Sequence, residues 1–176
     1  VYLRNIRYNT MDIYANGNYL MLAGGSYHTS ATSIFGGAYD GTVTGDPKLE
    51  IYSTGTGITT VAGGNYTGTL EGNTNTIIYN TSNNRIDFYG GGMGTTSAKV
   101  IVTGNITNEI KNLGASGAAS TGLGIYYGGC RYGDVYGTIR NTISGTGRNA
   151  DEDMKFIGAS RHGNTGSDRN KDAIIN

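Results

Sequence analysis

The chain has 176 residues, among them 31 glycines, one proline and one cysteine, and its 13 basic and 13 acidic side chains give a formal net charge of zero. A single proline excludes collagen and polyproline rods, and a single cysteine excludes an internal disulfide and a cysteine-based metal site. The scattered, balanced charge excludes a basic stripe that would follow a nucleic-acid backbone.

Composition also limits where the protein acts. No stretch approaches the ~18 apolar residues of a membrane span. Low charge combined with 14 tyrosines indicates ordered β-structure rather than disorder. A chain rich in Gly, Asn, Thr and Tyr and nearly free of cysteine predicts a secreted or cell-surface protein of bacterial origin. The first residue, Val1, predicts a processed mature form or an excised fragment.

Short runs of β-branched and aromatic residues, each followed by a polar or glycine turn, predict short strands along the whole chain. In chain order these runs lie at residues 13–17, 20–25, 51–55, 60–64, 77–80 and 85–91. Apolar residues alternate with polar ones, which predicts one buried face for each strand. The pairs expected on the buried face are Leu49 with Ile51, Ile86 with Phe88, Val100 with Val102, and Ile125 with Tyr127. Helical signals are confined to residues 107–113 and 150–156.

A recurring Gly-Gly unit sets the predicted architecture. Residues 36–45 align with residues 63–72, and residues 128–137 form a looser copy with one inserted residue. Self-similarity at a period of roughly 20–50 residues is the mark of a repeat architecture. The spacing from Gly37 to Gly64, and from Gly64 to Gly92, fits one three-sided coil. An antiparallel sandwich would instead predict two-residue hairpins without a long repeat.

The predicted fold is therefore all-β, a parallel β-helix or β-solenoid of about five to six coils, wound right-handed. Residues 1–176 form one domain, with a loop insertion around residues 111–122 and an irregular C-terminal segment over residues 146–176. Glycines are expected at the corners, where the chain needs a positive φ or a close backbone approach. The predicted corner glycines are Gly36, Gly37, Gly63, Gly64, Gly91, Gly92, Gly128 and Gly129.

The pattern Gly-Gly-x-Tyr-x-Gly-x-Val-x-Gly, followed by Thr and Ile strands and another Gly-Gly, resembles right-handed parallel β-helix repeats of bacterial adhesin-like surface proteins. The resemblance covers residues 10–145. It implies a solenoid and a cell-surface setting, and it assigns no catalytic residue. Residues 1–6 and 173–176 carry no cap, which predicts that copies pair end to end into a fibre or a surface array. The expected protein is structural or adhesive, non-enzymatic, and without a cofactor or a metal.

The main alternative is a carbohydrate-active or carbohydrate-binding β-helix similar to polysaccharide lyases and hydrolases. Such enzymes need carboxylates that are paired or clustered around a cation. The outward-facing candidates, with two nearby arginines, are Asp40, Glu71, Asp87, Asp134, Arg85 and Arg131. Each acid is expected to be solvated, as is the acidic cluster at residues 151–153. The histidines are His28 and His162, and nothing in the spacing marks a Ser and an Asp that would complete a catalytic triad with either. Cys130 is expected to be a buried apolar side chain.

Tyrosines provide the candidate binding residues. Tyr39 and Tyr66 share one repeat position, with Tyr27 and Tyr132 near it, so these rings are expected to stack on neighbouring coils. The ladder can serve to stabilise the solenoid, or it can contact a glycan or a protein partner. A remote alternative is ice binding through Thr-x-Thr ranks at residues 42–44, 67–69 and 74–76, although Ser97-Ala98-Lys99 breaks this pattern.

Overall fold

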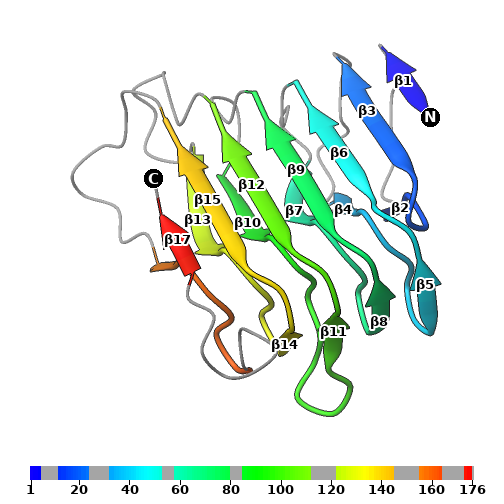
Figure 1. The fold of residues 1–176 in the computed structure, drawn as a ribbon. Helices are drawn as coiled ribbons and strands as arrows, with labels where there is room; N and C mark the ends of the chain where they lie inside the picture. The colour runs from blue at the N-terminus through cyan, green and yellow to red at the C-terminus, as the bar shows by residue number, and fades with distance from the viewer. Residues whose placement is uncertain are drawn as a thin grey trace.

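The computed structural model describes residues 1–4, 12–23, 32–52, 58–79, 85–111, 122–144, 155–163 and 173–175. Within these ranges the chain forms strands and no helix, and the strands assemble into three parallel sheets (Figure 1). The seven-stranded sheet contains, in spatial order, β1 (Tyr2–Arg4), β3 (Tyr19–Ala23), β6 (Lys48–Ile51), β9 (Thr74–Ile78), β12 (Ile106–Ile110), β15 (Ile139–Ile143) and β17 (Ala173–Ile175).

The other two sheets complete the walls of a parallel β-solenoid, which confirms the predicted fold class. The six-stranded sheet contains β16 (Lys155–Ile157), β13 (Gly122–Tyr127), β10 (Arg85–Tyr89), β7 (Ile58–Ala62), β4 (Thr32–Phe35) and β2 (Ile13–Tyr14). The four-stranded sheet contains β14 (Gly133–Val135), β11 (Val100–Val102), β8 (Gly68–Glu71) and β5 (Thr42–Thr44). Four successive coils, from β4–β6 to β13–β15, give one strand to each sheet in turn.

The prediction of five to six coils is too high if only coils with a strand in all three sheets are counted. The third sheet has four strands, so four described coils are complete. The coil that joins β2 to β3 is short because Asn16 (φ 51°) and Gly17 (φ 79°) turn the chain directly toward β3. The amides of these two residues donate to the carbonyls of Gly37 and Gly36 on the next coil, so the shortened coil still stacks in register.

Two further expectations need correction. Residues 107–110 are not helical but belong to β12, which pairs in parallel with β9 and β15. The C-terminal segment is not irregular throughout, because β16 and β17 extend two of the sheets. The loop insertion lies outside the described residues over 112–121, as do residues 150–154 of the second helical signal.

The alternating pattern places the core where it is predicted in three of the four pairs. Leu49, Ile51, Ile86, Phe88, Val100 and Val102 are all fully buried between the sheets. The fourth pair does share one face, and Tyr127 is fully buried, but in a second cluster against which Ile125 packs; Leu123 and Tyr126 join the central core instead. The register shifts by one residue at a β-bulge, because Ile86 pairs with Leu123 while Asp87 pairs with Ile125, so Leu123 and Tyr126 both face the central core although they are three residues apart.

Glycines line one corner because the backbones of successive coils meet there. A Cβ on Gly63 would lie 2.1 Å from the carbonyl oxygen of Gly90, and one on Gly36 would lie 2.0 Å from that of Gly63. None of the predicted corner glycines has a positive φ, so close approach is the cause. On the third coil Gly90 and Gly91 occupy these positions, one residue earlier than the predicted Gly91 and Gly92. We call this stack of Gly-Gly corners the glycine spine.

Candidate binding surface on the seven-stranded sheet

The outer side of the seven-stranded sheet carries the largest set of described tyrosines that reach solvent. Side chains of every second residue point outward here, while the residues between them fill the core. Because the pairing is in register, the outward side chains form columns across the strands. We call this surface the tyrosine face; it consists of Tyr2, Arg4, Tyr19, Met21, Ala23, Lys48, Glu50, Tyr52, Asn75, Ile77, Tyr79, Thr107, Glu109, Lys111, Arg140, Thr142 and Ser144.

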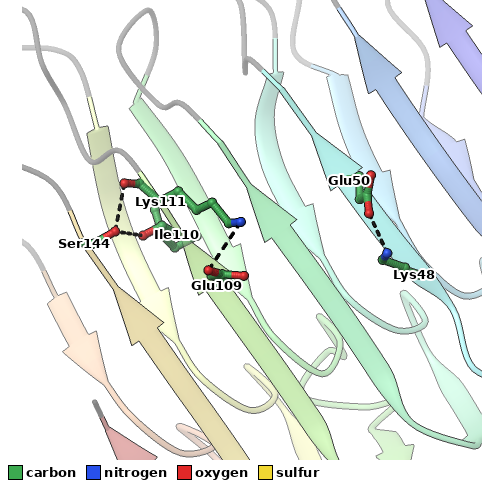
Figure 2. Close-up of polar contacts among 6 residues, drawn as sticks. All are labelled: Lys48, Glu50, Glu109, Ile110, Lys111 and Ser144. Atoms are coloured by element: carbon green, nitrogen blue, oxygen red, sulfur yellow. Dashed lines mark hydrogen bonds and ion pairs between the residues drawn. The ribbon is translucent and has the colours of Figure 1, made fainter.

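An ion pair with a tyrosine partner forms its centre. Figure 2 shows the ion pair between Lys48 and Glu50. The Nζ of Lys48 lies 2.5 Å from Oε1 of Glu50, and the hydroxyl of Tyr19 donates to Oε2 of Glu50 over 3.0 Å. The bond from Lys48 lowers the pKa of Glu50, and the same contact raises the pKa of Lys48. Burial and the bond to Glu50 raise the pKa of Tyr19 to about 12. The carboxylate is thus held ionised and oriented.

A second cluster stacks rings on the neighbouring column. The rings of Tyr52 and Tyr79 are parallel, with centroids 4.3 Å apart and an interplanar angle of 6°. The Nζ of Lys111 lies 4.7 Å from the Tyr79 centroid and 3.5 Å from Oε1 of Glu109. The hydroxyl of Ser144 donates to the carbonyl of Lys111 over 2.8 Å (Figure 2). Ring contacts and charges therefore continue from coil to coil along the face.

The tyrosines predicted from the repeat lie elsewhere, near the glycine spine. Tyr39 and Tyr66 stack with centroids 5.1 Å apart and an angle of 9°, which confirms the predicted ladder for this pair. Tyr132 does not join them; its ring stacks on His162 at 4.7 Å, and Arg131 continues the column because of the residue inserted in this copy. Tyr27 lies outside the described residues.

The Tyr39–Tyr66 pair has a structural role. Tyr66 packs its edge against the ring of Phe35, with centroids 5.8 Å apart, and belongs to the layer that covers a buried cluster of Phe35, Ala62, Tyr89 and Tyr127. Tyr39, in contrast, is 59% exposed. One ring of the pair therefore seals a second small core, and the other remains open to solvent.

The candidate carboxylates of the enzymatic alternative do not come together. Asp87 pairs with Thr60 and Ile125 in the six-stranded sheet, whereas Asp134 pairs with Ile101 in the four-stranded sheet. Glu71 is exposed and accepts a hydrogen bond from the Thr44 hydroxyl over 3.1 Å. Asp40 is exposed in the turn before β5. Among the described residues, no group of three or more His, Cys, Asp or Glu is placed to hold a metal ion.

The structure describes only some of the remaining candidates. Guanidinium Cζ of Arg131 lies 5.3 Å from the Tyr132 centroid, while His28 and residues 151–153 lie outside the described ranges, as does the side chain of Arg85. Cys130 is fully buried, as predicted, and burial raises the pKa of its thiol to about 12. A thiol with so high a pKa stays protonated and unreactive in the folded protein.

The threonine ranks do not form a flat outer face. Thr42 pairs with Thr69, but the next two positions of that column are Ile101 and Asp134. Thr74 and Thr76 point into the interior, where they are 1% and 0% exposed. In the described part of this column only one matched pair of outward threonines remains, so the ranks required for ice binding are interrupted.

A polar groove borders the tyrosine face at the corner before β6, β9 and β12. Its volume is about 430 Å³, and its floor includes the buried Pro47 and Thr74. A ladder of hydrogen bonds forms one wall. The backbone N–H of Asn73 donates to Oδ1 of Asp46 over 2.7 Å, and the backbone N–H of Asn105 donates to Oδ1 of Asn73 over 2.8 Å. This ladder repeats along the coil axis and presents polar groups to solvent.

Sequence reasoning missed Tyr2, Tyr19, Tyr52 and Tyr79 as surface candidates. A signal was present, because Ile51-Tyr52 and Ile78-Tyr79 both place a tyrosine directly after a buried strand residue.

In the described ranges, no helix is long and apolar enough to cross a membrane. When the chain was compared with protein-family models, with curated proteins and with solved structures, no match was found.

Proposed function

We propose that the protein is a non-enzymatic structural or adhesive element of a bacterial extracellular surface, and that it presents the tyrosine face to a partner. The observation that supports this proposal is the arrangement of tyrosines and ion pairs in ranks on one side of a stack of coils. Exposed aromatic rings offer a large contact area for a small loss of side-chain entropy. Because the Lys48–Glu50 pair holds Tyr19 in place, much of the contact surface is ordered before binding.

End-to-end association of copies is part of this proposal. Support comes from β5, which is an edge strand of the four-stranded sheet: among the described strands, it pairs with β8 alone. An unpaired strand edge can pair with another chain. Association along the coil axis would extend the tyrosine face over several molecules. We further propose that the coils wind right-handed, since about 98% of parallel crossover connections have this hand.

Glycan binding is a second candidate function, favoured by one observation. Tyr52 is 41% exposed, although Tyr79 covers one face of its ring. An aromatic face that is open to solvent can take a sugar ring by stacking. This candidate is compatible with adhesion, because glycans are themselves components of cell surfaces.

The test is a binding assay with labelled protein on two immobilised targets, the protein itself and a panel of oligosaccharides. The double variant Tyr19→Ala, Tyr52→Ala should weaken binding by about tenfold or more, because tyrosines that become buried in a complex often contribute much of the binding free energy. Tyr136→Ala is the matched control, because Tyr136 is 45% exposed beside β14, away from the tyrosine face. The proposal fails if wild-type protein binds neither target, or if the control weakens binding as much as the double variant.

A further inference from the structure

The tyrosine ladder of the tyrosine face stops at an alanine. The amide of Tyr52 donates to the carbonyl of Leu22, so Ala23 lies beside Tyr52 on the preceding coil. Arg4 pairs in turn with Ala23. The column therefore reads Arg4, Ala23, Tyr52, Tyr79, Lys111 and Ser144 across the sheet. In the described part of this column, only the small methyl group of Ala23 lies between the Tyr52 ring and the position of Arg4.

Among the described residues, one ring face of Tyr52 therefore has no stacked partner. Tyr79 has a neighbour on each side, with the Tyr52 ring at 4.3 Å and the Lys111 Nζ at 4.7 Å from its centroid. Tyr52 has Tyr79 on one side only, and it is the more exposed ring of the pair. The 41% exposure of Tyr52 agrees with a free ring face on the side of Ala23.

The opening has the thickness of one ring. Strands in a sheet are about 4.8 Å apart, so Arg4 and Tyr52 stand about 9–10 Å apart along the column. That separation leaves room for one further ring at the stacking distance seen between Tyr52 and Tyr79. Met21, half-buried on the same strand as Ala23, lies on one side of this opening, and Glu50 lies beside Tyr52 on its strand.

We propose that this opening, the ring slot (Arg4, Met21, Ala23, Glu50 and Tyr52), binds one pyranose ring of a glycan, stacked on the free face of Tyr52. The inference rests on the proposed adhesive function and adds its ligand. Glu50 is 8% exposed and already accepts bonds from Lys48 and Tyr19, which fix its orientation. A carboxylate has about four lone-pair sites, so capacity remains to accept a sugar hydroxyl.

The groups around the slot favour a sugar over an aromatic side chain. A pyranose has an apolar C–H face for Tyr52 and a rim of hydroxyls for the Glu50 carboxylate and the Arg4 guanidinium. An aromatic side chain would match the ring face but would leave most of these polar groups without a partner. A single stacked ring binds weakly, and repeated slots on associated copies would raise the avidity for a polymeric glycan.

The decisive variant is Ala23→Tyr, which fills the slot with a ring stacked on Tyr52. We expect it to lose at least tenfold in binding to the oligosaccharides that the wild-type protein binds, while its melting temperature stays equal or rises. Ser144→Tyr is the matched control, because it adds the same side chain at the other end of the column without touching the slot. Tyr52→Phe keeps the stacking ring and should bind within about threefold of wild type.

Each outcome of this experiment decides the question. Unchanged oligosaccharide binding by Ala23→Tyr, or no oligosaccharide binding by the wild-type protein, would overturn the slot. The adhesive function would survive the first result if the Tyr19→Ala, Tyr52→Ala variant still binds less. If Ala23→Tyr loses self-association but keeps oligosaccharide binding, a second copy of the chain occupies the opening. That result also overturns the proposal that the slot binds a glycan. If Ala23→Tyr does not fold, Arg4→Glu tests the same slot from an exposed side chain, and unchanged binding would count against it.

Discussion

Asn108 donates a hydrogen bond from its Nδ2 to Oδ1 of Asn141 on the next coil, over 2.8 Å, in the interior of the solenoid. Both side chains are fully buried. The Tyr126 hydroxyl donates to the same Oδ1 over 2.6 Å, and the Asn141 Nδ2 donates to the carbonyl of Gly158 over 2.9 Å. Asn141 therefore joins the seven-stranded sheet to the six-stranded sheet and to the corner next to it.

Replacing Asn141 by Ala should lower the free energy of unfolding by about 2–4 kcal/mol. The reason is that the Tyr126 hydroxyl would be left buried without its acceptor, in addition to the lost side-chain volume. Urea unfolding measures the change. Thr142→Ala, at the outward-facing neighbour, should stay within ~0.5 kcal/mol of wild type. Equal effects of the two substitutions would show that the amide network contributes little.

Two buried threonines in β9 should respond in opposite ways to valine. The Thr74 hydroxyl donates to the carbonyl of Gly90 over 2.9 Å, so Thr74→Val should lower the free energy of unfolding by about 1–2 kcal/mol. The Thr76 hydroxyl has no hydrogen-bond partner, so Thr76→Val should be neutral or stabilising, by up to about 1 kcal/mol. Melting temperatures of the two variants, measured side by side, provide the test. A larger loss for Thr76→Val would contradict this assignment.

Alanine should be far less tolerated in the glycine spine than at a turn glycine. Gly63→Ala would put a Cβ 2.1 Å from the carbonyl oxygen of Gly90, and we expect a loss above about 4 kcal/mol or no folded protein. Gly41 has a φ of 78°, but a methyl group added there would meet no atom within 4 Å, so Gly41→Ala should cost about 1–2 kcal/mol. Soluble yield and circular dichroism distinguish the two. A folded Gly63→Ala protein of near wild-type stability would refute the close-approach explanation.

The Glu50 carboxylate should make stability depend on acid pH. Its pKa is lower than usual, chiefly because of the bond from Lys48, so ionised Glu50 stabilises the folded state above the unfolded-chain pKa of about 4.3. This contribution is lost as the pH falls through the lower, folded-state pKa. Urea unfolding from pH 6 to about pH 3 should therefore show a steeper loss in wild type than in Glu50→Gln. Glu71→Gln, on the four-stranded sheet, is the control and should show the same pH dependence as wild type. If Glu50→Gln also lost stability as steeply as wild type, Glu50 would not be the source of the pH dependence.

The fold was predictable because the Gly-Gly corner repeats with the coil. The stack of Gly36, Gly63 and Gly128 follows directly from the alignment of the copies. The register at Gly90–Gly92 was not predictable, because three consecutive glycines offer no side chain that marks which two form the corner. Tyr132 was misplaced for a related reason, since the residue inserted in its copy can be accommodated on either side of Arg131.

Two features were harder to predict: which residues of a polar strand point inward, and which outward side chains of neighbouring coils form a column. Thr74, Asn75 and Thr76 are all polar, so alternation alone cannot say which of them point inward; their burial depends on Gly63 and Gly90, which leave room for them across the interior. Tyr52 and Tyr79 stack only when the lengths of the preceding coils are known. Columns of this kind are a property of strand register between coils, which is not encoded in any one strand.

The glycine spine has a consequence for how such a molecule changes over time. Neighbouring coils meet there through main-chain atoms, with Gly36, Gly63, Gly90 and Gly128 each lying against the carbonyl of the next corner. Any coil that ends in the same Gly-Gly pair offers the same docking surface above and below. Duplication or loss of one coil would therefore leave the joints intact, and the protein can lengthen or shorten by whole units while its outer side chains diversify independently.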